Sequence, residues 1–125
     1  MITADQILAH LVGDYLLQSN WMAREKTRQS FAAAVHAVTY TTPFAYLVSQ
    51  SLVALSIIAG THFLIDRFRL ARWIVWIKNG ESIFKNPTDT GYPLDMPPWL
   101  STWLFIIADN TLHLICNGLA LELRI

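Results

Sequence analysis

Four long apolar segments limit the folds that this sequence can adopt. They cover about residues 3–22, 30–48, 52–77 and 99–121. Their apolar residues recur with a spacing that is typical of helices, so we predict an α-helix for each segment. A helix needs about 20 mostly apolar residues to cross a membrane. Each segment reaches that length if its polar residues are tolerated, and the third must also continue past Asp66.

The composition separates a membrane bundle from a soluble one. Hydrophobic residues make up 54% of the chain and charged residues only 14%, against roughly 25% charged residues in soluble domains. The exposed faces of a soluble bundle would need more charges than nine acidic and nine basic residues supply. We therefore predict an all-α fold, a four-helix transmembrane bundle that forms one integral membrane domain over residues 1–125.

The chain after Asp66 is no longer uniformly apolar. The stretch "FRLARWIVWIK" mixes basic residues with tryptophans at helical period, which predicts an amphipathic, interfacial extension of the third helix. The Pro/Gly-rich stretch "NGESIFKNPTDTGYPLDMPP" follows. Loops of this length are usually functional or disordered, and we expect the part from Asn86 to Pro98 to act as a lid on the cytoplasmic side.

The distribution of charge predicts an orientation. Basic residues follow the first and third segments, whereas the link between the second and third carries no charge. The positive-inside rule then places the basic loops in the cytoplasm and both termini outside. The formal net charge is zero, so no basic field indicates nucleic acid as a partner. The N-terminus "MITADQ" lacks the basic region of a cleaved signal peptide, and the single cysteine, Cys116, excludes an intramolecular disulfide.

Each apolar segment contains one histidine, and three of the four histidines have an aspartate four positions away. Residues four apart lie on the same face of a helix. Counted from the predicted cytoplasmic ends, all seven groups fall in the cytoplasmic half of the membrane. The sequence therefore predicts one shared cluster, made of His10, Asp14, His36, His62, Asp66, Asp109 and His113.

Buried aspartates need compensation. An Asp at the centre of a membrane helix costs about 2.5–3.5 kcal/mol, so the three aspartates must face one another, water or a cation. A divalent metal ion would neutralise them, and a His/Asp ligand set suits Zn²⁺, Mn²⁺ or Fe better than Ca²⁺ or Mg²⁺. Seven groups are enough for two ions. Alternatives are ion pairs that join the helices, a proton or ion relay and, less favoured, haem ligation.

Four motifs also resemble a known family. They are "HLVGDYLLQSNWMAREK", "AVHAVTY", "THFLIDRFRLARW" and "GYPLDMPPWLSTWLFIIADNTLHL". Together they resemble a family of unknown function made of small polytopic membrane proteins of bacteria and phages. The resemblance implies a location in the bacterial inner membrane, and it implies that the seven His and Asp positions belong to the family pattern. It implies no established reaction. The style of the motifs is similar to that of membrane-bound metal-dependent hydrolases.

From these observations we expect a metal-dependent enzyme within the membrane. The favoured activity is hydrolysis of a membrane-associated phospholipid or another phosphoester. All seven groups are candidate ligands, and His36 and Asp14 are also candidate catalytic residues. Arg67, Arg69 and Tyr40 are candidate substrate-binding residues, and Gln18 and Asn117 are candidates for hydrogen bonds to the ligands. The alternatives are a component of ion or proton transport and a non-catalytic structural membrane protein. Membrane lipid and further copies of the same chain, in a homo-oligomer, are the candidate partners.

Overall fold

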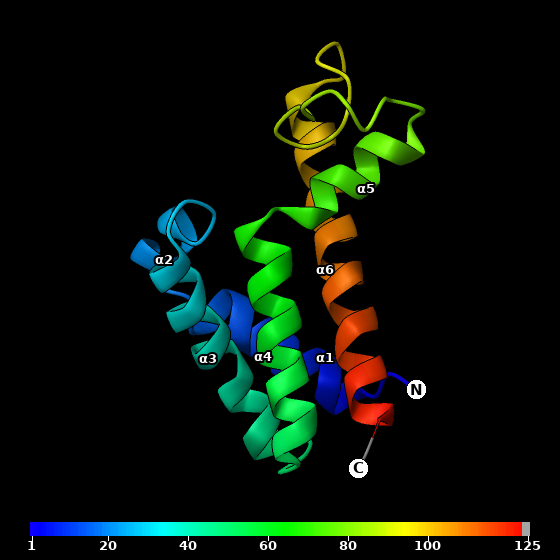
Figure 1. Cartoon of the computed structure of the whole chain (residues 1–125). Coiled ribbons are helices and arrows are strands. Elements are labelled where there is room, and N and C mark those ends of the chain that lie inside the picture. Colours follow the sequence, from blue (N-terminus) through cyan, green and yellow to red (C-terminus); the bar gives the residue numbers. More distant parts are fainter. Residues whose placement is uncertain (124–125) are drawn as a thin grey trace. The chain divides into compact units, whose positions relative to one another are not determined.

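The computed structural model describes residues 1–123, and within this range it contains helices and loops but no strand (Figure 1). The all-α class is thereby confirmed. The helices are α1 (Ala4–Leu11), the π-helix η1 (Val12–Leu16), α2 (Asn20–Glu25), α3 (Ser30–Leu47), α4 (Leu52–Arg67), α5 (Leu70–Lys78) and α6 (Pro98–Glu122).

The chain divides into two compact units. The first contains Met1–Phe68 together with the chain from His113 onward, and the second contains Arg69–Leu112. The first unit therefore holds α1, η1, α2, α3, α4 and the last part of α6. The second holds α5, the long loop and the first part of α6.

The N-terminal segment is interrupted where one continuous helix is expected. Thr3 caps α1 by accepting a hydrogen bond from the Gln6 backbone N–H at 3.3 Å. After η1 the helix ends, and Ser19 caps α2 by accepting from the Met22 N–H at 3.2 Å. A serine in this position satisfies a backbone donor that a new helix leaves open. The cap therefore favours a fresh start at Asn20 over continuation of the first helix.

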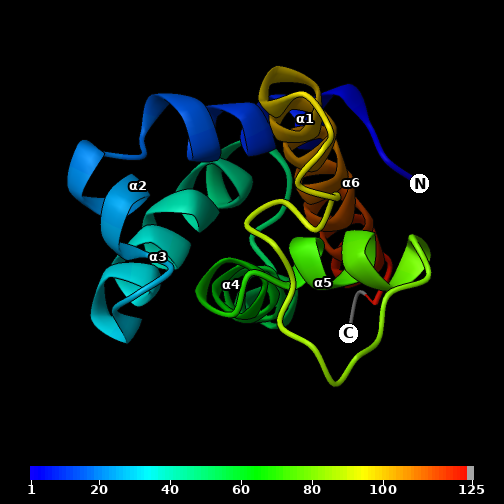
Figure 2. The ribbon, with the colours of Figure 1, turned by 90° about the horizontal axis from the view of Figure 1, so that it is seen from above.

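Helices α3 and α4 form the centre of the first unit. They run side by side (Figures 1 and 2), and Ser51 caps α4 by accepting from the Ala54 N–H at 3.3 Å. Pro43 is accommodated inside α3. The apolar core lies between α1, α3, α4 and the end of α6 and consists of Ala9, Tyr40, Phe44, Ala54, Ile58, Ala120 and Leu121.

The third predicted helix, over residues 52–77, is two helices. Helix α4 ends at Arg67, and Arg69 has a left-handed backbone with φ of 51°. A left-handed residue terminates a helix, although glycine is the usual residue there. The Arg69 guanidinium donates to the Asp89 carbonyl oxygen at 2.6 Å, which ties the start of α5 to the long loop. That loop approaches α5 closely at Gly91, where φ is +80° and a Cβ would lie 2.3 Å from the Arg72 carbonyl oxygen.

One helix within residues 1–123 has both the length and the hydropathy for a membrane crossing. It is α6, with 25 residues and a mean hydropathy of 1.5 over its best window. At 1.5 Å per residue, the 18 residues of α3 and 16 of α4 extend only about 27 and 24 Å, less than the roughly 30 Å of a bilayer core. The predicted bundle of four crossings is therefore not confirmed by the helix lengths.

Candidate metal centre

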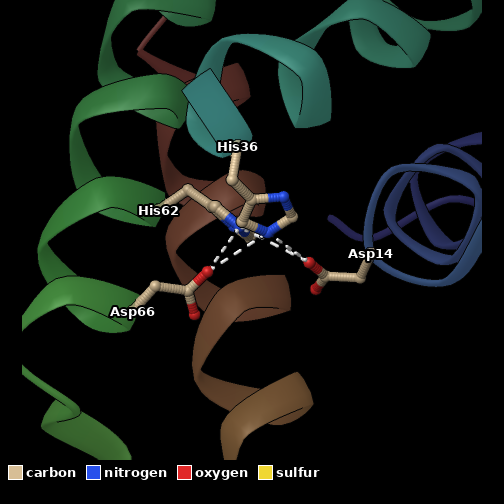
Figure 3. A group of neighbouring side chains, drawn as sticks. All are labelled: Asp14, His36, His62 and Asp66. Carbon is tan, nitrogen blue, oxygen red and sulfur yellow. Dashed lines mark hydrogen bonds and ion pairs between the residues drawn. The ribbon is translucent and has the colours of Figure 1, made fainter. Parts of the chain in front are cut away.

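Four side chains of the first unit converge on one point (Figure 3). Asp14 comes from η1, His36 from α3, and His62 and Asp66 from successive turns of α4. None of the four residues is more than 7% exposed. We call these four the His/Asp centre. Its members are two imidazoles and two carboxylates, which are common ligand types of transition metals.

The ligand atoms of the His/Asp centre already have the spacing that one metal ion requires. The two imidazole Nε2 atoms of His36 and His62 lie 2.9 Å apart. The Asp14 Oδ1 atom lies 3.1 Å from the first and 3.4 Å from the second. The Asp66 Oδ2 atom lies 3.2 Å and 3.1 Å from the same two nitrogens. Zinc–ligand bonds of 2.0–2.1 Å in a tetrahedron put neighbouring ligand atoms about 3.3 Å apart, so the group needs little movement to share an ion.

The π-helix η1 places Asp14 in this group. Single π-turns inside helices occur often at functional sites because the wider turn re-aims a side chain. The residue before Asp14 is Gly13, where a Cβ would lie 2.6 Å from Tyr40 Cδ2 and 2.9 Å from the Tyr40 carbonyl oxygen. Glycine therefore allows η1 to approach the backbone of α3. Gln18 donates to the Asp14 carbonyl oxygen at 3.2 Å, which stabilises the end of the π-turn.

Each carboxylate of the centre directs its second oxygen at another imidazole. The Asp14 Oδ2 atom lies 3.5 Å from His10 Nδ1, and the Asp66 Oδ1 atom lies 3.4 Å from His113 Nε2. Both histidines are 1% exposed. An imidazole that faces the outer oxygen of a ligating carboxylate can orient that carboxylate and tune its basicity. His10 and His113 thus flank the His/Asp centre on opposite carboxylates.

Tyr40 links His10 to the centre. Its ring stacks on the His62 ring, with centroids 3.6 Å apart and an interplanar angle of 15°. Its hydroxyl is hydrogen-bonded to His10 Nδ1 at 2.8 Å and accepts from the Asn117 amide at 2.6 Å. The Nδ1 atoms of His36 and His62 have no hydrogen-bond partner within residues 1–123. Stacking on Tyr40 therefore orients the His62 ring, and the contacts of Nε2 orient both rings.

One lysine of the first unit contacts a carboxylate of the centre. Lys26, the C-cap of α2, places its Nζ atom 2.8 Å from Asp66 Oδ2. With neutral imidazoles, two carboxylates and one ammonium give a net charge of −1. A buried site with excess negative charge and convergent nitrogen and oxygen atoms favours a bound cation.

The other predicted site residues are Arg67, Arg69, Asp109 and Tyr40. Arg67 donates to the Thr27 carbonyl oxygen at 3.0 Å and to Ser30 Oγ at 3.2 Å, so it fastens the loop before α3. Arg69 and Asp109 belong to the second unit, where Arg69 contacts Asp89. The Tyr40 side chain is fully buried. Substrate contacts of Arg67, Arg69 and Tyr40, and metal binding by Asp109, stay predictions.

Sequence reasoning missed Lys26 as a member of the site. Its position among three basic residues after the first apolar segment indicates only an orientation in the membrane. The break of the helix at Ser19 and the turn into α3 bring this lysine back toward α4. A local sequence pattern does not reveal such a return.

The chain was also compared with known proteins. A family model described as "Protein of unknown function (DUF3307)" matches residues 2–120. Searches of curated proteins and of solved structures find no significant match. The family match covers nearly the whole length and confirms the expected membership of a family of unknown function. The chain belongs to the DUF3307 family.

Proposed function

We propose that this protein is a metal-dependent hydrolase that acts on a membrane-associated phosphoester. The observation that carries the proposal is the convergence of four buried ligand atoms, two of them carboxylate oxygens. A divalent ion there would supply Lewis-acid activation of water and of the scissile group. His36, His62, Asp14 and Asp66 would hold it, with His10 and His113 orienting the two carboxylates.

The ligand types favour a transition metal. Two imidazoles and two carboxylates suit Zn²⁺, Mn²⁺ or Fe, whereas Ca²⁺ and Mg²⁺ prefer an all-oxygen set. The four atoms of the His/Asp centre account for one ion. Binding of a second ion stays a prediction.

The apolar surface supports the membrane part of the proposal. Helices α3 and α4 expose large apolar side chains, among them Phe31, Val38, Tyr46 and Leu52. Large contiguous apolar patches are rare on soluble monomers and mark contacts with partners or membranes. Lipid is the partner that we propose, in a bacterial inner membrane with the basic loops on the cytoplasmic side. Helices α3 and α4 would then enter the bilayer, although each is too short to cross it alone.

A relay is the second candidate function. Polar groups follow one another from Asn117 through Tyr40 and His10 to Asp14, and runs of this type carry protons in membrane transporters. A relay would give pH-dependent ion flux in vesicles from protein that contains no metal. A hydrolase would give no such flux.

Elemental analysis of the detergent-solubilised protein tests the metal proposal. After expression with metal supplied, we expect at least one tightly bound transition metal ion per chain. His62→Ala and Asp66→Asn should lose this ion together with the thermal stability that it confers. Asp95→Asn, which changes an exposed carboxylate, is the matched control and should retain both. Less than one ion per chain in the unmodified protein, or full occupancy in both site variants, would contradict the proposal.

A further inference from the structure

Lys26 is a charged group at the His/Asp centre to which the proposed metal site gives no role. Its side chain is 17% exposed, whereas that of its partner Asp66 is 4% exposed. The ammonium therefore lies at the boundary between the buried ligands and the surroundings. It contacts the same oxygen, Oδ2, that lies 3.1–3.2 Å from the two imidazole nitrogens.

The charges at the centre indicate which ligand would bind there once a metal ion is bound. Among the side chains of the first unit that meet at the centre, Asp14, Asp66 and Lys26 sum to −1 when the imidazoles are neutral. A divalent metal ion changes this sum to +1. A desolvated site with one excess positive charge favours a ligand with one negative charge. Four protein ligands also leave room for a further ligand where the ion expands its coordination.

We propose that Lys26 and the bound metal ion together hold a singly charged oxyanion of the substrate, namely a phosphodiester. This inference rests on the proposed function and adds the substrate class and the residue that recognises it. The lysine ammonium can leave Asp66 Oδ2 once the metal ion neutralises that oxygen. It would then be able to donate to an oxygen of the phosphodiester. Charge-assisted hydrogen bonds of this type are roughly twice as strong as neutral ones.

The arginines that the sequence indicates are less well placed for this task. The Arg67 guanidinium is engaged with Thr27 and Ser30, and Arg69 is engaged with Asp89 in the second unit. Lys26 is the cation whose contact with a member of the His/Asp centre the structure establishes, at 2.8 Å. Recognition of the anion is therefore assigned to Lys26.

Cobalt substitution provides a direct test, because the visible absorption of Co²⁺ responds to a new ligand. The full-length protein in detergent is loaded with Co²⁺ and titrated with dimethyl phosphate, a soluble anion with a single charge. We expect a saturable spectral change for the unmodified protein, and an affinity that is about tenfold weaker or worse for Lys26→Gln. Arg24→Gln and Arg28→Gln remove exposed charges of the same segment and should leave the affinity unchanged.

The outcomes separate this inference from the proposed function. If the unmodified protein does not bind Co²⁺, the metal site itself is wrong. If it binds Co²⁺ and Lys26→Gln keeps the full affinity for dimethyl phosphate, only the role of Lys26 is wrong. Neutral trimethyl phosphate gives a test that needs no variant: it should bind to the unmodified protein at least tenfold more weakly, and equal affinities would overturn the inference.

Two sources of phosphodiester are distinguished in the same assay. Micelles that carry phosphatidylglycerol present the diester as a lipid headgroup, whereas dimethyl phosphate presents it free. A spectral change that depends on Lys26 with the micelles supports a lipid substrate, and one confined to dimethyl phosphate supports a free diester. A change with micelles that persists in Lys26→Gln would contradict the inference, because the headgroup would then be recognised elsewhere.

Discussion

The buried Tyr40 side chain makes two separate kinds of contact. Its ring stacks on His62, and its hydroxyl connects His10 with Asn117. Removal of the hydroxyl leaves buried polar groups with one partner fewer, which usually costs more than the hydrogen bond itself contributes. The ring contact with His62 does not depend on the hydroxyl.

Tyr40→Phe should therefore separate stability from metal binding. We expect the free energy of unfolding to fall by about 1–3 kcal/mol, measured by denaturant titration in detergent. Metal content should stay at the unmodified level, because the stacked ring keeps the orientation of His62. Tyr46→Phe is the matched control, since Tyr46 is 89% exposed, and it should change stability little. Loss of metal in Tyr40→Phe would show that the hydroxyl itself orients the ligands.

At the scale of elements, the packing of η1 against α3 decides whether Asp14 reaches the centre. That packing depends on Gly13, whose position leaves no room for a methyl group beside the Tyr40 backbone. The neighbouring backbone is less able to move aside than a flexible side chain. A larger residue must therefore push η1 away and carry Asp14 with it.

Gly13→Ala should lower both stability and metal affinity. We expect a loss of about 1–3 kcal/mol in the free energy of unfolding, as for overpacked cores, and a weaker Zn²⁺ affinity in a competition titration. Gly60→Ala is the control on α4, two residues before His62, where an added Cβ meets nothing within 4 Å. Alanine in a helix there should be neutral or should stabilise by up to about 1 kcal/mol. Equal behaviour of the two variants would show that close approach of η1 is not required.

The elements also show how far the sequence allowed the fold to be predicted. Apolar periodicity located α3 and α6 to within one residue at each end, because long apolar helices dominate their local pattern. The breaks near Ser19 and Arg69 were not predicted. A serine cap inside an apolar helix looks like a tolerated polar residue, and a left-handed arginine lacks the glycine that normally marks such a position.

Part of the candidate site could be predicted from the spacing of its residues alone. A spacing of four residues fixes that His62 and Asp66 share a face of α4, whatever the tertiary fold. Which of the pairs meet is a property of the packing. The structure brings His36 and Asp14 to the α4 pair, whereas His10 and His113 lie on the outer oxygens of the two carboxylates. Lys26 enters the site only through the turn between α2 and α3.

At the scale of the whole molecule, α6 is the clearest test of membrane insertion. It has 25 residues, so it extends about 37 Å, and only 28% of its most apolar window is buried inside the protein. A core helix of a soluble protein would bury most of such a window. The exposed apolar side chains of α6 include Ile107, near the middle of the helix, and Leu119, near its end.

Single lysines at two exposed positions should separate a membrane helix from a helix in water. Ile107 is 57% exposed near the middle of α6, and Leu123 is 56% exposed just after its end. In a bilayer, Ile107→Lys should cost about 2.5–3.5 kcal/mol and reduce the protein that stays in membranes after an alkaline carbonate wash. Leu123→Lys should be retained, because a lysine at a helix end reaches the interface. In water both changes fall on a solvated surface and would be nearly neutral, so equal behaviour of the two variants would show that α6 does not cross the membrane.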